Sequence, residues 1–327
     1  MKISRWRNYF SILIILFLFI LPVSMHSPRY LSLFDEGFLN IILALSMYSM
    51  WTLGYVNAAT PTFFGLGAYT VAILTMKANL PFWLAFPIGG IVPATIAVIL
   101  GFPGLKVTGT YFLILTLAFC EFMGWLFTSW KSLFGGQTGI YPIRQPLIHV
   151  FGHTIDFSRS LVPYYYLALI LAILAYLVYF RIHRSRLGRV WDNIGTNGDL
   201  LANAKISVFT QKQICLAVSC LFAGLAGSIY APFMTIVTPG QFTFWQGVTV
   251  LLGVLVGGTF SPLGAIIGTV FMAVLSVLLQ RYSQYQPLIW GPILILTLLF
   301  MPSGLIGLPG KIINKIKEVT TTKVAES

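Results

Sequence analysis

Long apolar runs separated by short polar segments dominate this chain. A transmembrane helix needs about 20 mostly apolar residues, each adding a rise of about 1.5 Å. We predict about ten spans from this pattern: Phe10–Met25, Phe38–Tyr55, Thr62–Met76, Phe82–Phe102, Tyr111–Trp130, Val162–Phe180, Ile214–Phe233, Trp245–Phe260, Leu263–Leu279 and Leu288–Met301. The pair from Trp245 to Leu279 is divided only by residues 257–262, which predicts either a tight hairpin or a broken, partly re-entrant helix.

The predicted fold is therefore all-α, a polytopic transmembrane helix bundle of about 8–10 spans. Hydrocarbon offers no hydrogen-bond partner for a free backbone N–H or C=O, so each span must be a complete helix. We assign residues 1–308 to a single transmembrane domain and residues 309–327 to a short basic and polar tail.

Basic residues gather in three stretches, Lys2–Arg7, Arg181–Lys212 and Lys311–Lys323. The positive-inside rule places all three, and with them both termini, in the cytoplasm. Six predicted spans separate the first two stretches and four separate the last two, and these even numbers agree with that placement. Losing two spans together would also agree, so eight is the alternative. By the same parity, Lys131–Leu161 faces the periplasm.

The N-terminus has the outline of a signal peptide, because Lys2, Arg5 and Arg7 precede the apolar run Phe10–Leu21. No clear small-x-small cleavage site precedes the polar stretch His26–Arg29. We therefore expect an uncleaved first span.

The composition agrees with a lipid environment. Hydrophobic residues make up 57% of the chain and charged residues 9%, with a mean hydropathy of +0.86, whereas a soluble domain carries roughly 25% charged residues. The net charge of +12 arises in the loops between apolar runs. It therefore indicates cytoplasmic loops beside an anionic lipid leaflet and argues against a nucleic-acid partner.

Few side chains are candidates for chemistry. Glu121 is the only acid well inside a predicted span, and a charge at that depth is either part of a substrate path or a structural hydrogen-bonding group. The four histidines lie in predicted loops without metal-ligand spacing. We therefore expect no metal site, and the absence of a Ser/His/Asp set or carboxylate pair in a credible context predicts no enzyme activity. No phosphate-binding Gly-rich loop is present, so we expect no ATP hydrolysis by this chain. Small residues recur at spacings that favour close helix packing, in the groups Gly65–Ala68, Ala223–Gly227 and Gly253–Gly268.

Several ordered motifs resemble the membrane permeases of branched-chain amino acid ABC importers. The motifs are Phe63–Tyr69, Leu105–Phe119, Gly135–Ile140, Ser185–Arg189, Ala223–Gly227, Gly257–Gly264 and Pro302–Leu308. Each is weak alone, but together they occur in the family's order over residues 54–308.

The resemblance implies one membrane subunit of an importer in the bacterial inner membrane. A homologous second permease would complete the path, two cytoplasmic ATP-binding subunits would drive it, and a periplasmic binding protein would deliver the solute. ATP would bind the partner ATPases, with no cofactor in this chain. Within the cytoplasmic loop at 181–213, the coupling helix would lie near Thr196–Val208, and the coupling residues would be Arg186, Asp199, Leu201, Ala202, Ala204, Lys205, Ile206 and Val208.

Two departures from the family pattern stand out. The segment Val56–Thr62 is about three residues shorter than usual, and Lys205 occupies a position where glycine is usual. We predict branched-chain or other apolar amino acids as the solute, with urea or short amides as the alternative. The predicted path residues are Asn57, Thr60, Phe63, Phe64 and Glu121.

Two other classes compete with the importer. An ion-coupled secondary transporter should carry several intramembrane acids, whereas only Glu121 is found. A membrane-embedded enzyme should carry clustered catalytic groups, and the sequence provides none.

Overall fold

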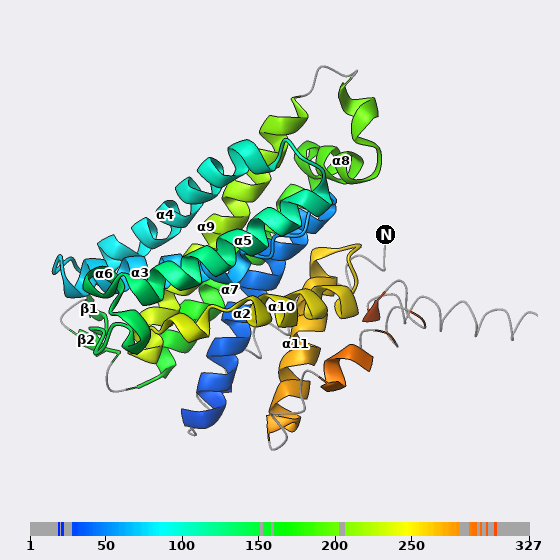
Figure 1. Cartoon of the computed structure of the whole chain (residues 1–327). Helices are drawn as coiled ribbons and strands as arrows, with labels where there is room; N and C mark the ends of the chain where they lie inside the picture. Colours follow the sequence, from blue (N-terminus) through cyan, green and yellow to red (C-terminus); the bar gives the residue numbers. More distant parts are fainter. Residues whose placement is uncertain are drawn as a thin grey trace, which may run out of the picture.

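The structure is a computed structural model that describes residues 19, 21–22, 28–150, 153–157, 160–202, 207–280, 288–292, 295, 299 and 304–305. Its helices form the bundle shown in Figure 1. The long elements are α2 (Pro28–Thr52), α3 (Thr60–Met76), α4 (Phe82–Gly104), α5 (Gly109–Ser129), α7 (Val162–Arg184), α8 (Arg186–Ala202), α9 (Val208–Met234), α10 (Phe244–Gly257) and α11 (Pro262–Leu278). The short elements are α6 (Lys131–Phe134), η1 (Gly136–Thr138), β1 (Leu147–Val150), β2 (His153–Asp156) and η2 (Pro239–Gln241).

The predicted helix bundle is confirmed. Six helices of the described chain are long and apolar enough to cross a membrane, and α3 and α11 are shorter apolar helices. Together these eight elements match the eight predicted spans between residues 38 and 279. Most of the first predicted span, Phe10–Met25, and half of the last, Leu288–Met301, lie outside the described residues. The antiparallel hairpin β1–β2, which pairs Leu147 with Asp156, is an addition to the predicted all-α fold.

Helix α2 begins ten residues before the predicted start at Phe38. Pro28 opens the helix, and Asp35 and Glu36 lie inside it rather than in the preceding loop. Proline suits the first turn of a helix because the missing N–H has no intrahelical partner there. The helix therefore extends ten residues beyond the predicted span toward the N-terminus.

Helix α3 lies at the centre of the bundle, where small residues let its neighbours approach closely. A Cβ atom added to Gly67 would lie 2.1 Å from the carbonyl oxygen of Gly224 in α9, and one added to Gly227 would lie 1.8 Å from that of Phe64. Both helices therefore meet backbone to backbone. This contact confirms the packing role predicted for the small-residue groups around Gly67 and Gly224.

Helices α10 and α11 pack on each other across a short turn, as the hairpin alternative predicts. Gly258 turns the chain with φ of +110°, a backbone conformation that L side chains rarely adopt. A Cβ atom added to Gly257 would lie 1.9 Å from the carbonyl oxygen of Gly264. The glycines therefore bring the two helices into close contact directly after the turn.

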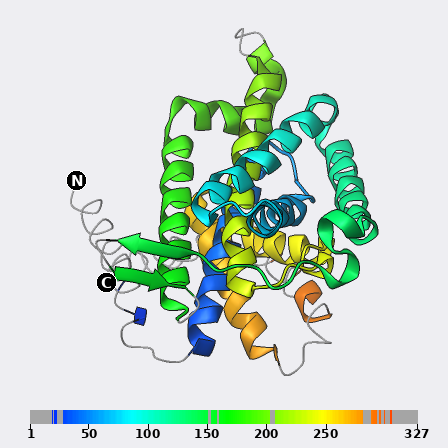
Figure 2. The same ribbon diagram turned by 90° about the vertical axis from the view of Figure 1, so that its left-hand side faces the viewer.

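The bundle has two distinct ends. Helix α8 lies at one end, and the β1–β2 hairpin with α6 lies at the other (Figures 1 and 2). Helix α7 connects the two ends with 23 residues, about 35 Å at 1.5 Å per residue. This length is sufficient to cross a bilayer core. The arrangement agrees with the predicted placement of the two segments on opposite sides of the membrane.

Candidate functional site

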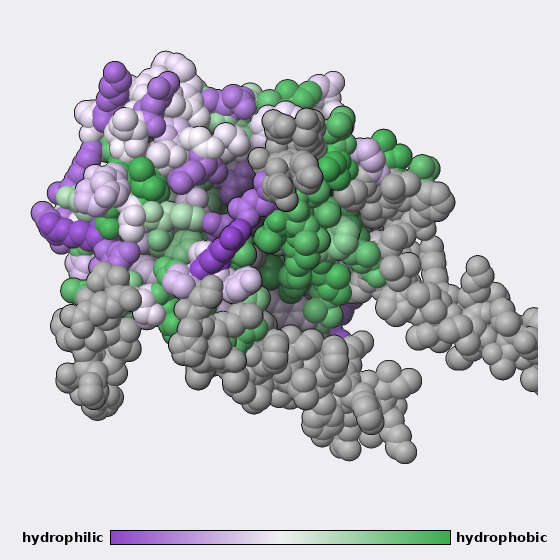
Figure 3. All heavy atoms as spheres, turned by 90° about the horizontal axis from the view of Figure 1, so that it is seen from below, coloured by the Kyte–Doolittle hydropathy of each residue, from purple (hydrophilic) through white to green (hydrophobic). Residues whose placement is uncertain are grey.

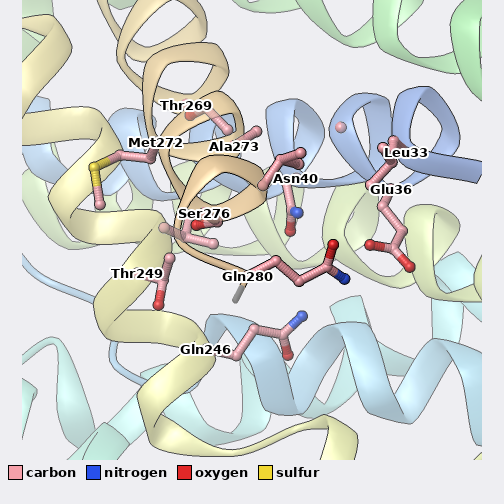
Figure 4. Close-up of a pocket in the computed structure, with 13 residues that line it drawn as sticks. Leu33, Glu36, Asn40, Gln246, Thr249, Thr269, Met272, Ala273, Ser276 and Gln280 are labelled. Carbon is pink, nitrogen blue, oxygen red and sulfur yellow. The ribbon is translucent and has the colours of Figure 1, made fainter. Parts of the chain in front are cut away.

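A polar cavity of about 340 Å³ opens between α2, α10 and α11. Its polar wall consists of Glu36 and Asn40 from α2, Gln246 and Thr249 from α10, Thr269 and Ser276 from α11, and Gln280 beyond the end of α11. Figure 4 shows the side chains of Glu36, Gln246 and Gln280 pointing into the same space. We call this space the α2–α10–α11 cavity.

Hydrogen bonds within the cavity wall decide which of its atoms remain available. The hydroxyl of Thr249 donates to the carbonyl of Trp245 at 3.1 Å, and that of Thr269 donates to the carbonyl of Ala265 at 2.7 Å. Their oxygens are therefore left as acceptors. Gln246 Oε1 is buried and has no hydrogen-bond partner within the described chain. A buried carbonyl oxygen without a partner carries a desolvation penalty that a ligand donor would relieve.

One contact closes the rim of the cavity. Arg29 Nη2 donates to Gln280 Oε1 at 3.2 Å, which joins the start of α2 to the end of α11. This rim lies at the end of α2 that is remote from α8 (Figure 1). Figure 3 views the molecule from that side and shows hydrophilic residues beside a continuous hydrophobic surface. A polar opening next to a lipid-compatible surface is typical of a solute site within a membrane domain.

Sequence reasoning missed the acidic pair at positions 35 and 36. Glu36 lies eight residues from the start of α2, or about 12 Å along the helix axis. Asp35 is 1% exposed, and neither of its carboxylate oxygens has a hydrogen-bond partner in the described structure. The available signal was Pro28, a helix-initiating residue placed directly before an amphipathic turn.

The predicted path residues Asn57, Thr60, Phe63 and Phe64 lie together at the start of α3, but in the packed core of this chain. All four are at most 2% exposed. The Thr60 hydroxyl donates to the Asn57 carbonyl at 2.9 Å, and the Phe63 ring stacks on Phe119 at 5.5 Å between centroids. None of the four lines the α2–α10–α11 cavity. Their part in a solute path stays a prediction.

The fifth predicted residue, Glu121, lies apart from the other four. Its side chain is exposed on α5, on a face that also carries the exposed side chains of Tyr111, Ile114, Phe122 and Trp125. A carboxylate on an otherwise apolar helix face needs a polar partner or an aqueous path. The other described residues leave the Glu121 carboxylate exposed.

The predicted coupling segment forms a longer helix than expected. We predicted a coupling helix near Thr196–Val208, whereas α8 runs over 17 residues from Arg186 to Ala202. Gly188, Trp191 and Ile194 recur every three residues on its buried side, a spacing that already indicates a helix. Arg186 opens α8, Val208 opens α9, and Asp199, Leu201 and Ala202 lie in the last turn of α8. Ala204, Lys205 and Ile206 lie outside the described residues.

One polar contact joins α8 to the spans. Trp191 Nε1 donates to Gln211 Oε1 of α9 at 3.3 Å. Beside it, the Tyr48 hydroxyl and His183 Nδ1 are 3.3 Å apart and border a second cavity of about 470 Å³ together with Asp192. Burial raises the pKa of Asp192 above its usual range, and the neighbouring His183 lowers it in part. Helix α8 thus packs against α2, α7 and α9, while Arg186 and Arg189 stay exposed.

These features define a class of protein. Apolar spans, a polar cavity within the membrane domain and an amphipathic helix anchored at one end of the bundle are the parts of a multi-pass membrane transport protein.

Comparison with known proteins gives the family. The family described as branched-chain amino acid transport system, permease component, matches residues 30–302, and the chain belongs to this family. The high-affinity branched-chain amino acid transport system permease proteins LivM of Salmonella typhimurium and of Escherichia coli are each 30% identical over 286 residues, which covers 82% of this chain and 66% of theirs. The corresponding protein LivH of Escherichia coli is 28% identical over 185 residues, or 54% of this chain and 55% of its own length.

The chain spans slightly less than two thirds of the length of these LivM relatives. No solved structure matches it. Family membership and the six long apolar helices identify a multi-pass protein of the bacterial inner membrane.

Proposed function

We propose that this chain is a permease subunit of a binding-protein-dependent ABC importer and translocates branched-chain amino acids. The observation that carries the proposal is the family match over residues 30–302, which includes every described span. The α2–α10–α11 cavity supports the proposal. A polar cavity among apolar spans fits a role in binding a small solute better than a purely structural role.

The proposed assembly contains a homologous second permease, two cytoplasmic ATP-binding subunits and a periplasmic solute-binding protein. LivM and LivH are both named as permease proteins of one kind of transport system, and this chain is similar to each. ATP would bind the partner ATPases, so the chain itself needs no cofactor. The solute would leave chemically unchanged, because the chain shifts between two conformations that differ in access.

Helix α8 is the proposed contact with an ATP-binding subunit. A short amphipathic helix can dock into a groove of a partner with one face while the other face packs on its own domain. Trp191 and Ile194 supply the packed face, and the exposed Arg186 and Arg189 lie elsewhere on the helix. The predicted docking residues Asp199, Leu201 and Ala202 follow at its end.

The apolar face of α5 that carries Glu121 is the proposed contact with the second permease. Tyr111, Ile114 and Trp125 are 64, 59 and 62% exposed on this face. Lipid would suit the aromatic and aliphatic groups but would penalise the carboxylate. A second permease could supply both an apolar surface and a polar partner for Glu121, as the predicted path between two permeases requires.

The test is co-expression of the chain with its neighbouring genes and co-purification in mild detergent. We expect a stable complex whose ATP hydrolysis rises when binding protein loaded with L-leucine, L-isoleucine or L-valine is added. The same measurement with urea and acetamide tests the alternative solute class. A chain that purifies alone and transports only under an ion gradient would refute the importer and favour a secondary transporter.

A further inference from the structure

We propose that the α2–α10–α11 cavity binds the ammonium group of an aliphatic amino acid in transit, with the Glu36 carboxylate as its acceptor. The inference rests on the proposed importer function and goes beyond it by assigning a solute site within this single permease. The site lies near the rim formed by Arg29 and Gln280, away from α8.

Glu36 carries the only formal charge among the described residues that line the cavity. Within the described chain, no basic side chain forms an ion pair with it, and the neighbouring Arg29 donates to Gln280 instead. The Glu36 side chain is exposed where it lines the cavity and has no cationic partner among the described residues. A cationic ligand group would supply the missing charge.

Two hydroxyl groups of the cavity wall can accept hydrogen bonds from a ligand. Thr249 and Thr269 have used their hydroxyl protons on their own helices, so both oxygens can only accept. The Gln246 side chain also borders the cavity, and its buried Oε1 has no hydrogen-bond partner within the described structure. An ammonium group offers three donors, so it can bond the Glu36 carboxylate together with neighbouring acceptors.

The cavity also has an apolar wall. Leu33, Val250, Met272, Ala273 and Val277 line it together with the polar groups. Methionine adapts its shape to different aliphatic groups because its side chain is unbranched and flexible. A volume of about 340 Å³ lies at the lower end of the range of roughly 300–1,000 Å³ found for ligand sites, which suits a small solute.

A metal cation fits these groups less well. Among the described residues, no group of three or more His, Cys, Asp and Glu side chains could hold a metal ion. Calcium takes six to eight oxygen ligands, usually from several carboxylates. One carboxylate with separated amide and hydroxyl oxygens matches an ammonium group better.

The first test measures binding to the purified importer complex in lipid nanodiscs, with Glu36→Gln as the variant. Glutamine keeps the size of the side chain and removes its negative charge. We expect the affinity for radiolabelled L-leucine to fall about 10- to 100-fold, the range for losing a hydrogen bond to a charged group. The affinity for 3-methylbutylamine, which has the ammonium group alone, should fall equally. Binding of 4-methylpentanoate, which has only the carboxylate, should not weaken.

The second test locates the ligand. A Thr249→Cys variant places a thiol in the cavity, while the natural cysteines Cys120, Cys215 and Cys220 are buried. L-leucine should slow the modification of the new thiol by a membrane-impermeant methanethiosulfonate. The matched control is Ser132→Cys in α6, whose exposed side chain lies outside the cavity. Its modification rate should be the same with and without L-leucine.

The outcomes separate this inference from the proposed function. If Glu36→Gln binds L-leucine as tightly as the wild type, and L-leucine does not protect the thiol introduced by Thr249→Cys, the cavity is no solute site although the importer remains. If the wild-type complex transports no aliphatic amino acid, the proposed function fails. The binding of 3-methylbutylamine to the purified full chain then still decides the question. A Glu36-dependent affinity supports the ammonium site, and an unchanged affinity refutes it.

Discussion

Gly227→Ala tests whether α3 and α9 meet backbone to backbone. The added Cβ atom would lie 1.8 Å from the Phe64 carbonyl oxygen, 2.8 Å from its carbonyl carbon and 2.9 Å from the Ala68 nitrogen. A carbon and a carbonyl oxygen need about 3.3 Å, so the helices must separate by about 1.5 Å. All three neighbouring atoms belong to the backbone, so no side-chain rotation can relieve the overlap.

The magnitude follows from the cost of overpacking, about 1–3 kcal/mol and occasionally more. We expect the upper end of this range, because the overlapped atoms all belong to the backbone of α3. At roughly 2–4 °C per kcal/mol for a large domain, the melting temperature should fall by at least about 5 °C. The measurement is thermal unfolding of the purified chain in detergent, followed by size-exclusion chromatography of the remaining folded protein.

Gly124→Ala is the matched control. Gly124 also lies inside a helix, but a Cβ atom added there would meet nothing within 4 Å in the described chain. Alanine is a better helix former than glycine by up to about 1 kcal/mol, so this variant should melt at the wild-type temperature or slightly above it. If Gly227→Ala also melts within about 1 °C of the wild type, the reasoning about the α3–α9 contact is refuted.

Three further predictions concern the ends and faces of the bundle. Gly195→Ala in α8 places a Cβ atom 2.3 Å from the Thr52 carbonyl oxygen, so α8 should shift and ATP hydrolysis should lose its stimulation by loaded binding protein. Unchanged stimulation would show that the position of α8 is irrelevant to coupling. The raised pKa of Asp192 means that the folded state binds a proton more readily than the unfolded state, so the stability contribution of this group falls as pH rises from 3.8 through the raised pKa. Asp192→Asn should remove this slope from melting temperatures measured between pH 4 and 7, and a slope equal to that of the wild type would contradict the burial argument. Glu121→Gln should leave the free energy of unfolding of the isolated chain within about 0.5 kcal/mol of the wild type, since its side chain is exposed, but should lower recovery of the second permease in pull-downs; equal recovery would argue against the α5 interface.

The amino-acid sequence alone was enough to predict the class of structure. In lipid, the length and composition of each apolar run decide whether it forms a span, and both properties are local. The groups around Gly67 and Gly224 predicted close packing of helices, because only small residues allow two backbones to approach. The motifs from Phe63 to Leu308 predicted the family, which the match over residues 30–302 confirms.

The sequence also indicated that α8 begins earlier than the predicted coupling helix. The spacing of Gly188, Trp191 and Ile194 indicates a helix from Arg186 onward. The β1–β2 hairpin was missed because four-residue strands leave too short a periodic pattern to detect.

The cavity required the tertiary structure. Glu36 and Gln280 are separated by 244 residues in the sequence and meet only because α2 packs beside α11. Hydropathy cannot reveal which faces of two spans meet, because lipid tails are as apolar as the protein interior and impose no inside–outside pattern. Run length and composition thus determined the spans, whereas the packing of their faces determined where Glu36, Gln246 and Gln280 converge.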